Sequence, residues 1–314
     1  MKKIKLVTHS GRFHADDVFA TAVLSLLFEK QKKEFELIRS RKPEDIEEGD
    51  IVYDNGRQYD FENKIFDHHQ EGGAGERENN VPYAAFGLIW KHYGEELVNE
   101  LFKKNIEDDE ISNDDLKKIW QLVDESIVQP IDASDTGYED FQSDKKDLRS
   151  YVMDSFVKDF NPTSDEDYEK SYELFMESVS IAKRVLSRKI ISTKSKVKAL
   201  KKVREIYEST EDKRIIILEE GGSWKEFLID KPEPLYVIFP TSDSDGWMVQ
   251  GVNTKPTGYD LRKSFPENWC GKSAEELEKE IGIEGVKFCH LKGFLCVTKT
   301  KEQAIELANV AVEK

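Results

Sequence analysis

The sequence contains 314 residues, of which 38% are hydrophobic and 35% are charged, and its formal net charge at pH 7 is −16. Its three cysteines are widely spaced, no apolar run approaches the roughly 20 residues of a membrane span, and the first residues lack the apolar region and cleavage site typical of a signal peptide. We therefore expect a two-domain cytoplasmic protein with no disulfide framework and no membrane partner, whose acidic charge disfavours nucleic acid unless basic residues cluster or metal ions neutralise the binding site.

The first part of the chain alternates short apolar runs with amphipathic segments. Strands are predicted over residues 3–9, Phe35–Ser40, Asp50–Asp54 and Lys64–Asp67. An amphipathic helix is expected from Asp16 or Asp17 to Lys30, an acidic turn over Pro43–Gly49, and a loop rich in glycine and glutamate over Glu71–Asn80. Strands joined through helices by short loops predict an α/β fold with an N-terminal, doubly wound, mainly parallel sheet.

Further helices and one basic segment follow. The helices are predicted over Pro82–Phe102, Leu116–Ile131, Leu148–Phe160 and Glu166–Arg188. The last of them continues into Lys183–Arg204, which has ten basic residues in 22 and no acidic residue. We place the domain boundary inside this segment, so that the two domains cover residues 1–190 and residues 191–314.

The second domain is predicted to be a smaller α/β domain. Its strands are expected over Arg214–Glu219, Leu235–Pro240, Trp247–Val252, Gly285–His290 and Phe294–Thr298. Helices are expected over Ser273–Ile281 and Glu302–Val312. Ser273, followed three residues later by Glu276, is typical of a helical capping box.

Histidine and aspartate gather where the predicted strands end. Four of the six histidines lie in two short stretches: His9, His14, His68 and His69. His9, Asp54 and His68 each follow a predicted strand, and His14 and Asp16 lie on the loop into the first helix. Ligands of open parallel sheets gather beyond the carboxyl ends of the strands, so we expect these side chains to meet. Imidazole and carboxylate groups bind ions such as Mn²⁺, and a pair of ions about 3.5–4 Å apart is suited to phosphoester hydrolysis.

These motifs resemble those of a known superfamily. Asp67-His68-His69 is similar to the motif that names the Asp-His-His (DHH) phosphoesterases, which include single-strand exonucleases, nano-RNases, pyrophosphatases and exopolyphosphatases. Residues 8–17 resemble the first motif of the Myg-type branch, a family of metal-dependent hydrolases. The stretches 66–70, 131–135, 265–269 and 288–294 support the same match. The resemblance therefore covers nearly the whole chain.

The resemblance implies two divalent metal ions. Mn²⁺ is the expected ion, and Mg²⁺, Co²⁺ or Zn²⁺ are alternatives. One ion would be bound by His9, His14 and Asp54, and the other by Asp16, His68 and Asp132, with Asp54 as the bridge. Asp17 and Asp135 are rival ligands. His69 would face the phosphate group, so Asp54 and His69 are the candidate catalytic residues. His14 stands one residue beyond the position where the family usually has an aspartate, which favours an ion softer than Mg²⁺.

The function implied by the resemblance is hydrolysis of a phosphodiester by metal-activated water, with residues 1–190 as the DHH-like catalytic domain. A 3′-5′ exonuclease acting on RNA or single-stranded DNA is the first hypothesis. One alternative is a phosphoesterase for small phosphorylated substrates, such as short oligonucleotides, cyclic dinucleotides or polyphosphate. The other is a catalytically weak regulatory protein that binds metal or nucleotide. A homodimer is a candidate assembly.

Residues 191–314 are expected to bind the substrate. His290 lies in a stretch that resembles the superfamily's substrate motif, and Arg262 and Lys263 precede the Phe-Pro-Glu-Asn-Trp stretch. The basic segment adds three candidate contacts, Lys196, Lys198 and Lys201. The alternative interpretations are a packed histidine and solvated surface cations.

Overall fold

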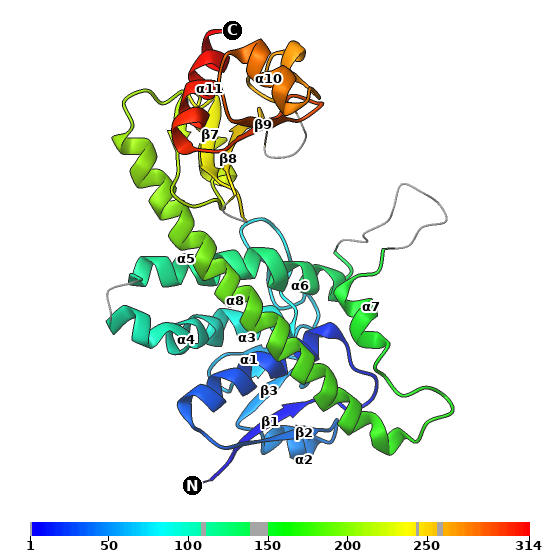
Figure 1. Ribbon diagram of the computed structural model, residues 1–314. Coiled ribbons are helices and arrows are strands. Elements are labelled where there is room, and N and C mark those ends of the chain that lie inside the picture. The colour runs from blue at the N-terminus through cyan, green and yellow to red at the C-terminus, as the bar shows by residue number, and fades with distance from the viewer. Residues whose placement is uncertain (1, 108–110, 139–149, 243–244, 256–259) are drawn as a thin grey trace. The chain divides into compact units, whose positions relative to one another are not determined.

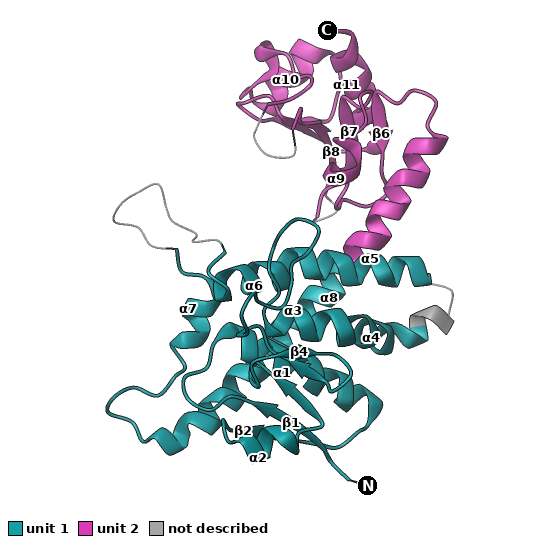
Figure 2. Ribbon diagram, turned by 180° about the vertical axis from the view of Figure 1, so that it is seen from behind, with its two compact units in different colours: residues 1–194 teal, residues 195–314 magenta. Residues whose placement is uncertain are grey.

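The computed structural model describes residues 2–107, 111–138, 150–242, 245–255 and 260–314. The chain forms two compact units, Met1–Lys194 and Ser195–Lys314 (Figure 2). Each unit contains one five-stranded sheet. The division falls within helix α8 (Ser171–Ser209), which contains the basic segment. Over the described residues, no helix combines the length and the apolar character needed to cross a membrane.

The sheet of the N-terminal unit is parallel apart from one edge strand. It contains β1 (Ile4–Thr8), β2 (Phe35–Arg39), β3 (Ile51–Tyr53), β4 (Tyr59–Asp60) and β5 (Ile65–Phe66), in the order β2-β1-β3-β5-β4. Figure 1 labels the first three of these strands. Neighbouring strands pair in parallel, except that β4, a short strand that was not predicted, pairs antiparallel with β5. The strand order reverses at β1, with β2 on one side and β3 on the other. Parallel sheets bind ligands beyond the carboxyl ends of the strands at such a reversal.

Two early helices lie on opposite sides of this sheet. Helix α1 (Ala15–Gln31) lies on one side and α2 (Pro43–Glu47) on the other (Figures 1 and 2). The helix predicted from Asp16 or Asp17 to Lys30 is confirmed, but the expectation of a single apolar face is wrong, because residues 15–28 are all buried and later helices of the unit pack against it. The predicted acidic turn over Pro43–Gly49 contains one helical turn instead, which begins with proline at its first position.

Two long helical segments of the N-terminal unit each contain a π-helical turn, which is one extra residue in the α-helical repeat. The first segment consists of α3 (Ala85–Ile89), η1 (Trp90–Gly94) and α4 (Glu95–Glu107), and the second of α5 (Asn113–Val123), η2 (Asp124–Val128) and α6 (Gln129–Asp135). Nε1 of Trp90 donates to the carbonyl of Trp120 over 3.3 Å, and Nε1 of Trp120 donates to the carbonyl of Trp90 over 3.2 Å. The second segment ends at Asp135 instead of the predicted Ile131, so Asp132 lies in a helix.

Three elements complete the N-terminal unit. These are α7 (Met153–Lys158), the 3₁₀ turn η3 (Tyr168–Lys170) and the first part of α8. Helix α7 is shorter than the helix predicted over Leu148–Phe160, and residues 148 and 149 of that prediction lie outside the described residues.

The C-terminal unit has a mixed sheet covered by short helices. Its strands are β6 (Ile215–Ile217), β7 (Tyr236–Pro240), β8 (Trp247–Gly251), β9 (Val286–Cys289) and β10 (Leu295–Thr298), in the order β6-β7-β8-β10-β9. Its helices are α9 (Lys225–Leu228), η4 (Glu267–Trp269), α10 (Ala274–Ile281) and α11 (Lys301–Glu313). The predicted capping box is confirmed, because the Ser273 N–H donates to the Glu276 carboxylate over 2.9 Å and the Glu276 N–H donates to the Ser273 hydroxyl over 3.4 Å. The protein is therefore α/β with two mixed sheets.

Candidate metal centre

Histidine and aspartate side chains lie together at the carboxyl edge of the N-terminal sheet. Within the described part of the chain, three overlapping groups could hold a metal ion, because the ligand atoms of each group lie within 4.8 Å of one another. The groups are His9, His14 and Asp54; Asp16, His68 and Asp135; and Asp54, Asp67, His68 and His69. This cluster, which is buried in large part, could therefore bind metal ions.

His9, directly after β1, lies between two carboxylates. Its Nε2 is 3.1 Å from Oδ2 of Asp54, which follows β3, and 3.2 Å from Oδ2 of Asp17 in the first turn of α1. Burial lowers the pKa of His9, but its bonds to Asp17 and Asp54 outweigh this effect and raise the pKa to about 10. Without a bound ion, His9 is therefore protonated at neutral pH, and a metal ion has to displace that proton.

His14 belongs to the same group and is the N-cap residue of α1. Its ring centroid lies 5.8 Å from that of His9, and its backbone N–H donates to Oδ1 of Asp17 over 2.9 Å. Asp17, one of the two rival ligands, thus caps the helix with one oxygen and contacts His9 with the other.

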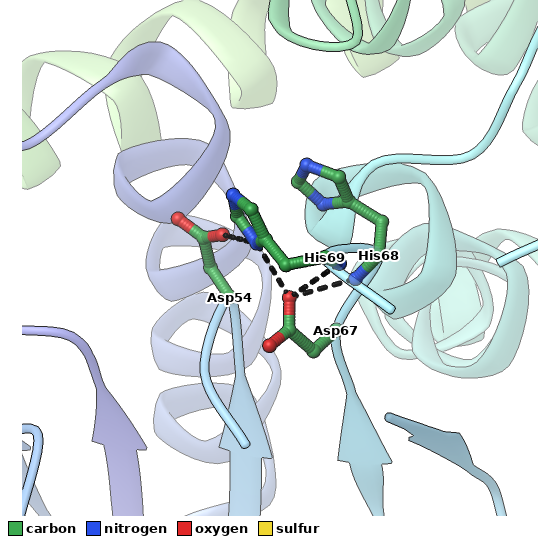
Figure 3. A group of neighbouring side chains, drawn as sticks. All are labelled: Asp54, Asp67, His68 and His69. Carbon is green, nitrogen blue, oxygen red and sulfur yellow. Dashed lines mark hydrogen bonds and ion pairs between the residues drawn. The ribbon is translucent and has the colours of Figure 1, made fainter. Parts of the chain in front are cut away.

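Asp54 has a left-handed backbone with φ of 50°, a conformation that aspartate and asparagine adopt more readily than most residues. Its N–H donates to the carbonyl of Phe66 on β5 over 3.1 Å. Oδ2 faces His9, and Oδ1 lies 3.4 Å from Nδ1 of His69 (Figure 3). Burial raises the pKa of Asp54, but the hydrogen bond from His9 and the charges of nearby histidines outweigh it and lower the pKa. Each oxygen of this carboxylate therefore faces a different histidine.

Asp67 organises the turn that carries the histidine pair. Its Oδ1 accepts hydrogen bonds from the N–H groups of His68 and His69 and from Nδ1 of His69, over 2.7, 3.1 and 2.7 Å (Figure 3). Its Oδ2 accepts from the N–H of Arg57 over 2.7 Å. No role for Asp67 follows from the metal-ligand pattern of the sequence, although an aspartate that bonds the backbone N–H groups of the residues after it is typical of an Asx turn.

The second group joins Asp16, His68 and Asp135. The carboxylate of Asp16 accepts hydrogen bonds from the N–H groups of Ala85 and Phe86, at the start of α3, over 3.1 and 2.6 Å. Nε2 of His68 lies 3.1 Å from Oδ2 of Asp135, the last residue of α6. Burial and the charges of three neighbouring aspartates raise the pKa of Asp16 well above its usual value. A divalent cation bound by Asp16, His68 and Asp135 would offset the repulsion between Asp16 and the neighbouring aspartates.

Asp132, a ligand implied by the resemblance, belongs to none of the three groups. It is fully buried on α6, with Oδ2 paired to the Arg77 guanidinium at 2.8 Å and Oδ1 accepting from the N–H of Gly87 over 2.9 Å. Arg77 also forms a bidentate pair with Asp124, with both distances 3.0 Å. Burial raises the pKa of Asp132 to about 7, against the opposing effect of Arg77. The structure thus brings the rival ligand Asp135, and not Asp132, next to His68.

Gly87 leaves no room for a side chain beside Asp132, because a Cβ atom there would lie 1.8 Å from Oδ2 of Asp132. We expect Gly87→Ala to lower the free energy of unfolding by about 1–3 kcal/mol, since Asp132 or Arg77 must move. Urea unfolding followed by circular dichroism measures the change. Gly222→Ala is the control, because the nearest neighbour of its Cβ would be Ala199 at 3.8 Å. Equal losses in the two variants would contradict this packing.

Two pockets open onto the cluster. The first, of about 440 Å³, is lined by His9, His14, Asp54 and His69, together with Arg41 and Arg57. The second, of about 550 Å³, is lined by His68, His69, Asp135 and residues 72–76. The glycine-rich loop predicted over Glu71–Asn80 therefore forms part of the wall of the site.

The predicted contacts Arg262 and Lys263 bond to backbone carbonyls within the C-terminal unit. The Arg262 guanidinium donates to the carbonyls of residues 229, 231 and 234, around the end of α9. Nζ of Lys263 donates to the carbonyl of Val312 in α11 over 2.7 Å. Both cations therefore hold elements of this unit together.

The other predicted contacts lie on α8 and after β9. Lys196 pairs with Glu226 at 2.7 Å, Lys198 is half-buried and Lys201 is exposed. Nδ1 of His290 accepts from the N–H of Lys292 over 3.0 Å, and its ring centroid lies 4.2 Å from that of Phe294. His290 is thus held by a local turn and a ring contact.

Buried atoms in and beside the three groups, which together we call the metal-binding cluster, leave room for ligand bonds. Among the described residues, the buried Nδ1 of His68 has no hydrogen-bond partner, and the buried Oδ2 of Asp17 and Oδ1 of Asp54 have the contacts with His9 and His69 given above, at 3.2 and 3.4 Å. A buried polar atom without a hydrogen bond or a bound ligand lowers the stability of the fold by about 1–3 kcal/mol, so each such atom requires an explanation. A mixed set of imidazole nitrogens and carboxylate oxygens suits first-row divalent ions such as Mn²⁺. The residues present therefore fit a divalent metal ion.

Comparison with known proteins places the chain in a family. The family model MYG1_exonuc, described as Uncharacterised protein family (UPF0160), matches residues 5–312. The chain belongs to this family. MYG1 proteins from Caenorhabditis elegans and Saccharomyces cerevisiae are each 31% identical to it, over 98% of this chain and 94% and 95% of their own lengths. A human MYG1 exonuclease is 27% identical over 98% of this chain and 85% of its own length.

These matches confirm the predicted membership of the Myg family. The prediction of a hydrolase of the nuclease or phosphoesterase class is confirmed at that level. Among solved structures, a pGpG-specific phosphodiesterase, PggH, from a Vibrio species covers 99% of both chains with 15% identity and a TM-score of 0.27, which is too low to bear on the fold.

Proposed function

We propose that this MYG1-family chain is a divalent-metal-dependent phosphodiesterase, and in particular a 3′-5′ exonuclease acting on RNA or single-stranded DNA. The observation that carries the proposal is the buried cluster of histidines and aspartates, in which two of the three groups share Asp54. The exonuclease names of the human and cattle relatives support nucleic acid as the substrate. The Asp67-His68-His69 motif supports a place in the DHH superfamily with its doubly wound sheet. Cytoplasmic location and a homodimer stay predictions.

We assign the ligands of two ions, preferably Mn²⁺, from the groups of the cluster. His9, His14 and Asp54 would hold one ion, and Asp16, His68 and Asp54 the other. Asp135 replaces Asp132 as the remaining ligand of the second ion, because Asp135 contacts His68 while Asp132 is paired with Arg77. When bound, such ions lower the pKa of a water ligand towards 7 and neutralise charge on a phosphate.

The protein's own residues orient the phosphate and stabilise its charge. The hydrogen bond to Asp67 fixes the ring of His69 and raises its pKa above the usual value, so His69 remains a cationic donor closer to neutral pH. Its side chain is 58% exposed and lines both pockets, so it can reach a phosphoryl oxygen. Arg57, exposed at the first pocket, adds a positive charge. The C-terminal unit is proposed to bind the rest of the substrate.

A second candidate function is hydrolysis of small phosphorylated substrates. Pockets of about 440 and 550 Å³ lie within the usual size range of small-molecule sites, about 300–1,000 Å³. Activity that is highest on a dinucleotide and falls with strand length would favour this function over the exonuclease.

Metal removal tests the proposed chemistry. After treatment with EDTA, turnover of 5′- and 3′-labelled RNA and DNA oligonucleotides should fall by roughly 10²-fold or more and return with Mn²⁺, because loss of charge stabilisation has an effect of that size. Resolving the products by length shows which end is attacked. Full activity in protein shown to be metal-free would contradict the proposal. No turnover with Mn²⁺, Mg²⁺, Co²⁺ or Zn²⁺ would favour the regulatory alternative.

A further inference from the structure

A groove with three cations lies in the N-terminal unit, outside the metal-binding cluster. It has a volume of about 690 Å³ and is lined by Arg184, Arg188 and Lys189 of α8, Met153 of α7 and Ile127 of η2, among others. Arg184 and Arg188 are exposed and lie one helical turn apart, so both side chains project from the same face of α8. We call this surface the α8 groove.

The cations of the α8 groove differ from their neighbours on the same helix. Lys183 pairs with Glu29, and Lys196 pairs with Glu226 at 2.7 Å. Arg184, Arg188 and Lys189 form neither an ion pair nor a side-chain hydrogen bond with any residue of the described ranges. In a chain with a net charge of −16, three unpaired cations on one surface concentrate positive charge where an anion would be attracted.

Helix α7 connects the α8 groove with the metal-binding cluster. Met153 lines the groove, and the next residue, Asp154, lines the pocket that contains His9 and His14. A second connection runs along η2 and α6, because Ile127 lines the groove and Asp135, eight residues later, lines both pockets of the cluster. Eight residues of helix span about 12 Å. A strand that ends at the cluster therefore needs to extend by only a few nucleotides to reach the groove.

We propose that the α8 groove holds the phosphate backbone of a single-stranded nucleic acid whose end lies at the metal-binding cluster. The proposal rests on the proposed function and specifies a polymer as its substrate. Arginine guanidinium groups bind phosphate oxygens in a bidentate manner, and the apolar side chains between them can contact sugars and bases without reading sequence. A dinucleotide is too short to occupy both places.

The test compares substrates of different length. For a twelve-nucleotide RNA, the kcat/KM of the variant R184E/R188E/K189E should be lower than that of the wild type by at least about 10-fold. For a dinucleotide, the kcat/KM of the two proteins should be equal. Each phosphate contact of a single strand contributes about 0.7 to the slope of log affinity against log salt concentration, so the slope should fall by about 2. Fluorescence anisotropy of the labelled strand in EDTA measures that slope without turnover, and a DNA strand of equal length shows whether the sugar matters.

The charge-matched control is K103E/K104E/K118E, which changes exposed lysines on α4 and α5. It should leave the length dependence and the salt slope unchanged. Thermal unfolding shows whether each variant is folded, and R184K/R188K/K189R, which keeps the three charges, should restore most of the binding. An unchanged salt slope in the charge-reversal variant, or an equal loss on the dinucleotide and the long strand, would overturn the proposal. Absence of turnover by the wild type would contradict the proposed function instead, and the anisotropy measurement would still decide on the groove.

Discussion

Asp54→Asn should remove most of the activity and lower the metal content while the protein stays folded. Asp54 contributes to two of the three ligand groups, and its two oxygens face His9 and His69. Loss of one charge-stabilising group in an active site typically costs 10²–10³-fold in kcat, and we expect a loss of about 10³-fold because both proposed ion positions are affected. Asparagine tolerates a left-handed backbone, so the φ of 50° can be kept. Turnover of labelled RNA and elemental analysis of the purified variant measure both effects.

Asp50→Asn is the matched control for this substitution. Asp50 lies directly before the N-terminal end of β3, away from the cluster, and accepts a hydrogen bond from the N–H of Lys5 over 2.9 Å. Asp50→Asn therefore makes the same aspartate-to-asparagine change outside the site. It should keep its metal and its activity. Full metal content and full activity in Asp54→Asn would contradict the assignment of Asp54 as a shared ligand.

Arg77→Met should lower the free energy of unfolding of the N-terminal unit at pH 8 by about 3–5 kcal/mol, the usual cost of leaving a buried charge without its partner. Arg77 is 8% exposed and pairs with both Asp124 and Asp132, and Asp132 is fully buried. Methionine keeps much of the volume and removes the charge. Urea unfolding measures the loss. In the control Lys183→Met, an exposed pair with Glu29 is lost, which should cost about 0–1 kcal/mol.

The loss in Arg77→Met should also depend on pH. The pKa of Asp132 is about 7 in the folded protein against an ordinary 3.8, so the folded state binds more protons between these values and stability falls as the pH rises through this range. The charge of Arg77 lowers the pKa of Asp132. Removing Arg77 therefore raises that pKa further and extends the pH range over which stability falls to values above 7. The difference between variant and wild type should therefore be small at pH 5 and large at pH 8. A difference that does not change with pH would contradict the role of Asp132.

The parts of the site that follow strands could be predicted from the sequence. β1, β3 and β5 are short apolar runs that end directly before His9, Asp54 and Asp67. In a parallel sheet the carboxyl ends of neighbouring strands meet at one edge, so local sequence was enough to bring these side chains together.

The contributions of the helices could not be predicted in this way. Asp132 and Asp135 are both carboxylates near the end of one helix, and the rotation of α6 together with the distant Arg77 decides which of them meets His68. Arg262 and Lys263 look like free cations in the sequence, but carbonyls from distant elements use their donors. Partners far along the chain leave no local signal in the sequence.

The π-helical turn η2 has a consequence for the alignment of MYG1 proteins. A π-helical turn takes up one extra residue without rotating the helix that follows it. A relative that lacks one residue between Asp124 and Val128 would therefore have a regular α-helix there and would still present Asp135 to His68. A one-residue gap after Val128, with η2 kept, would instead rotate the end of α6 by about 100° and turn Asp135 away from His68.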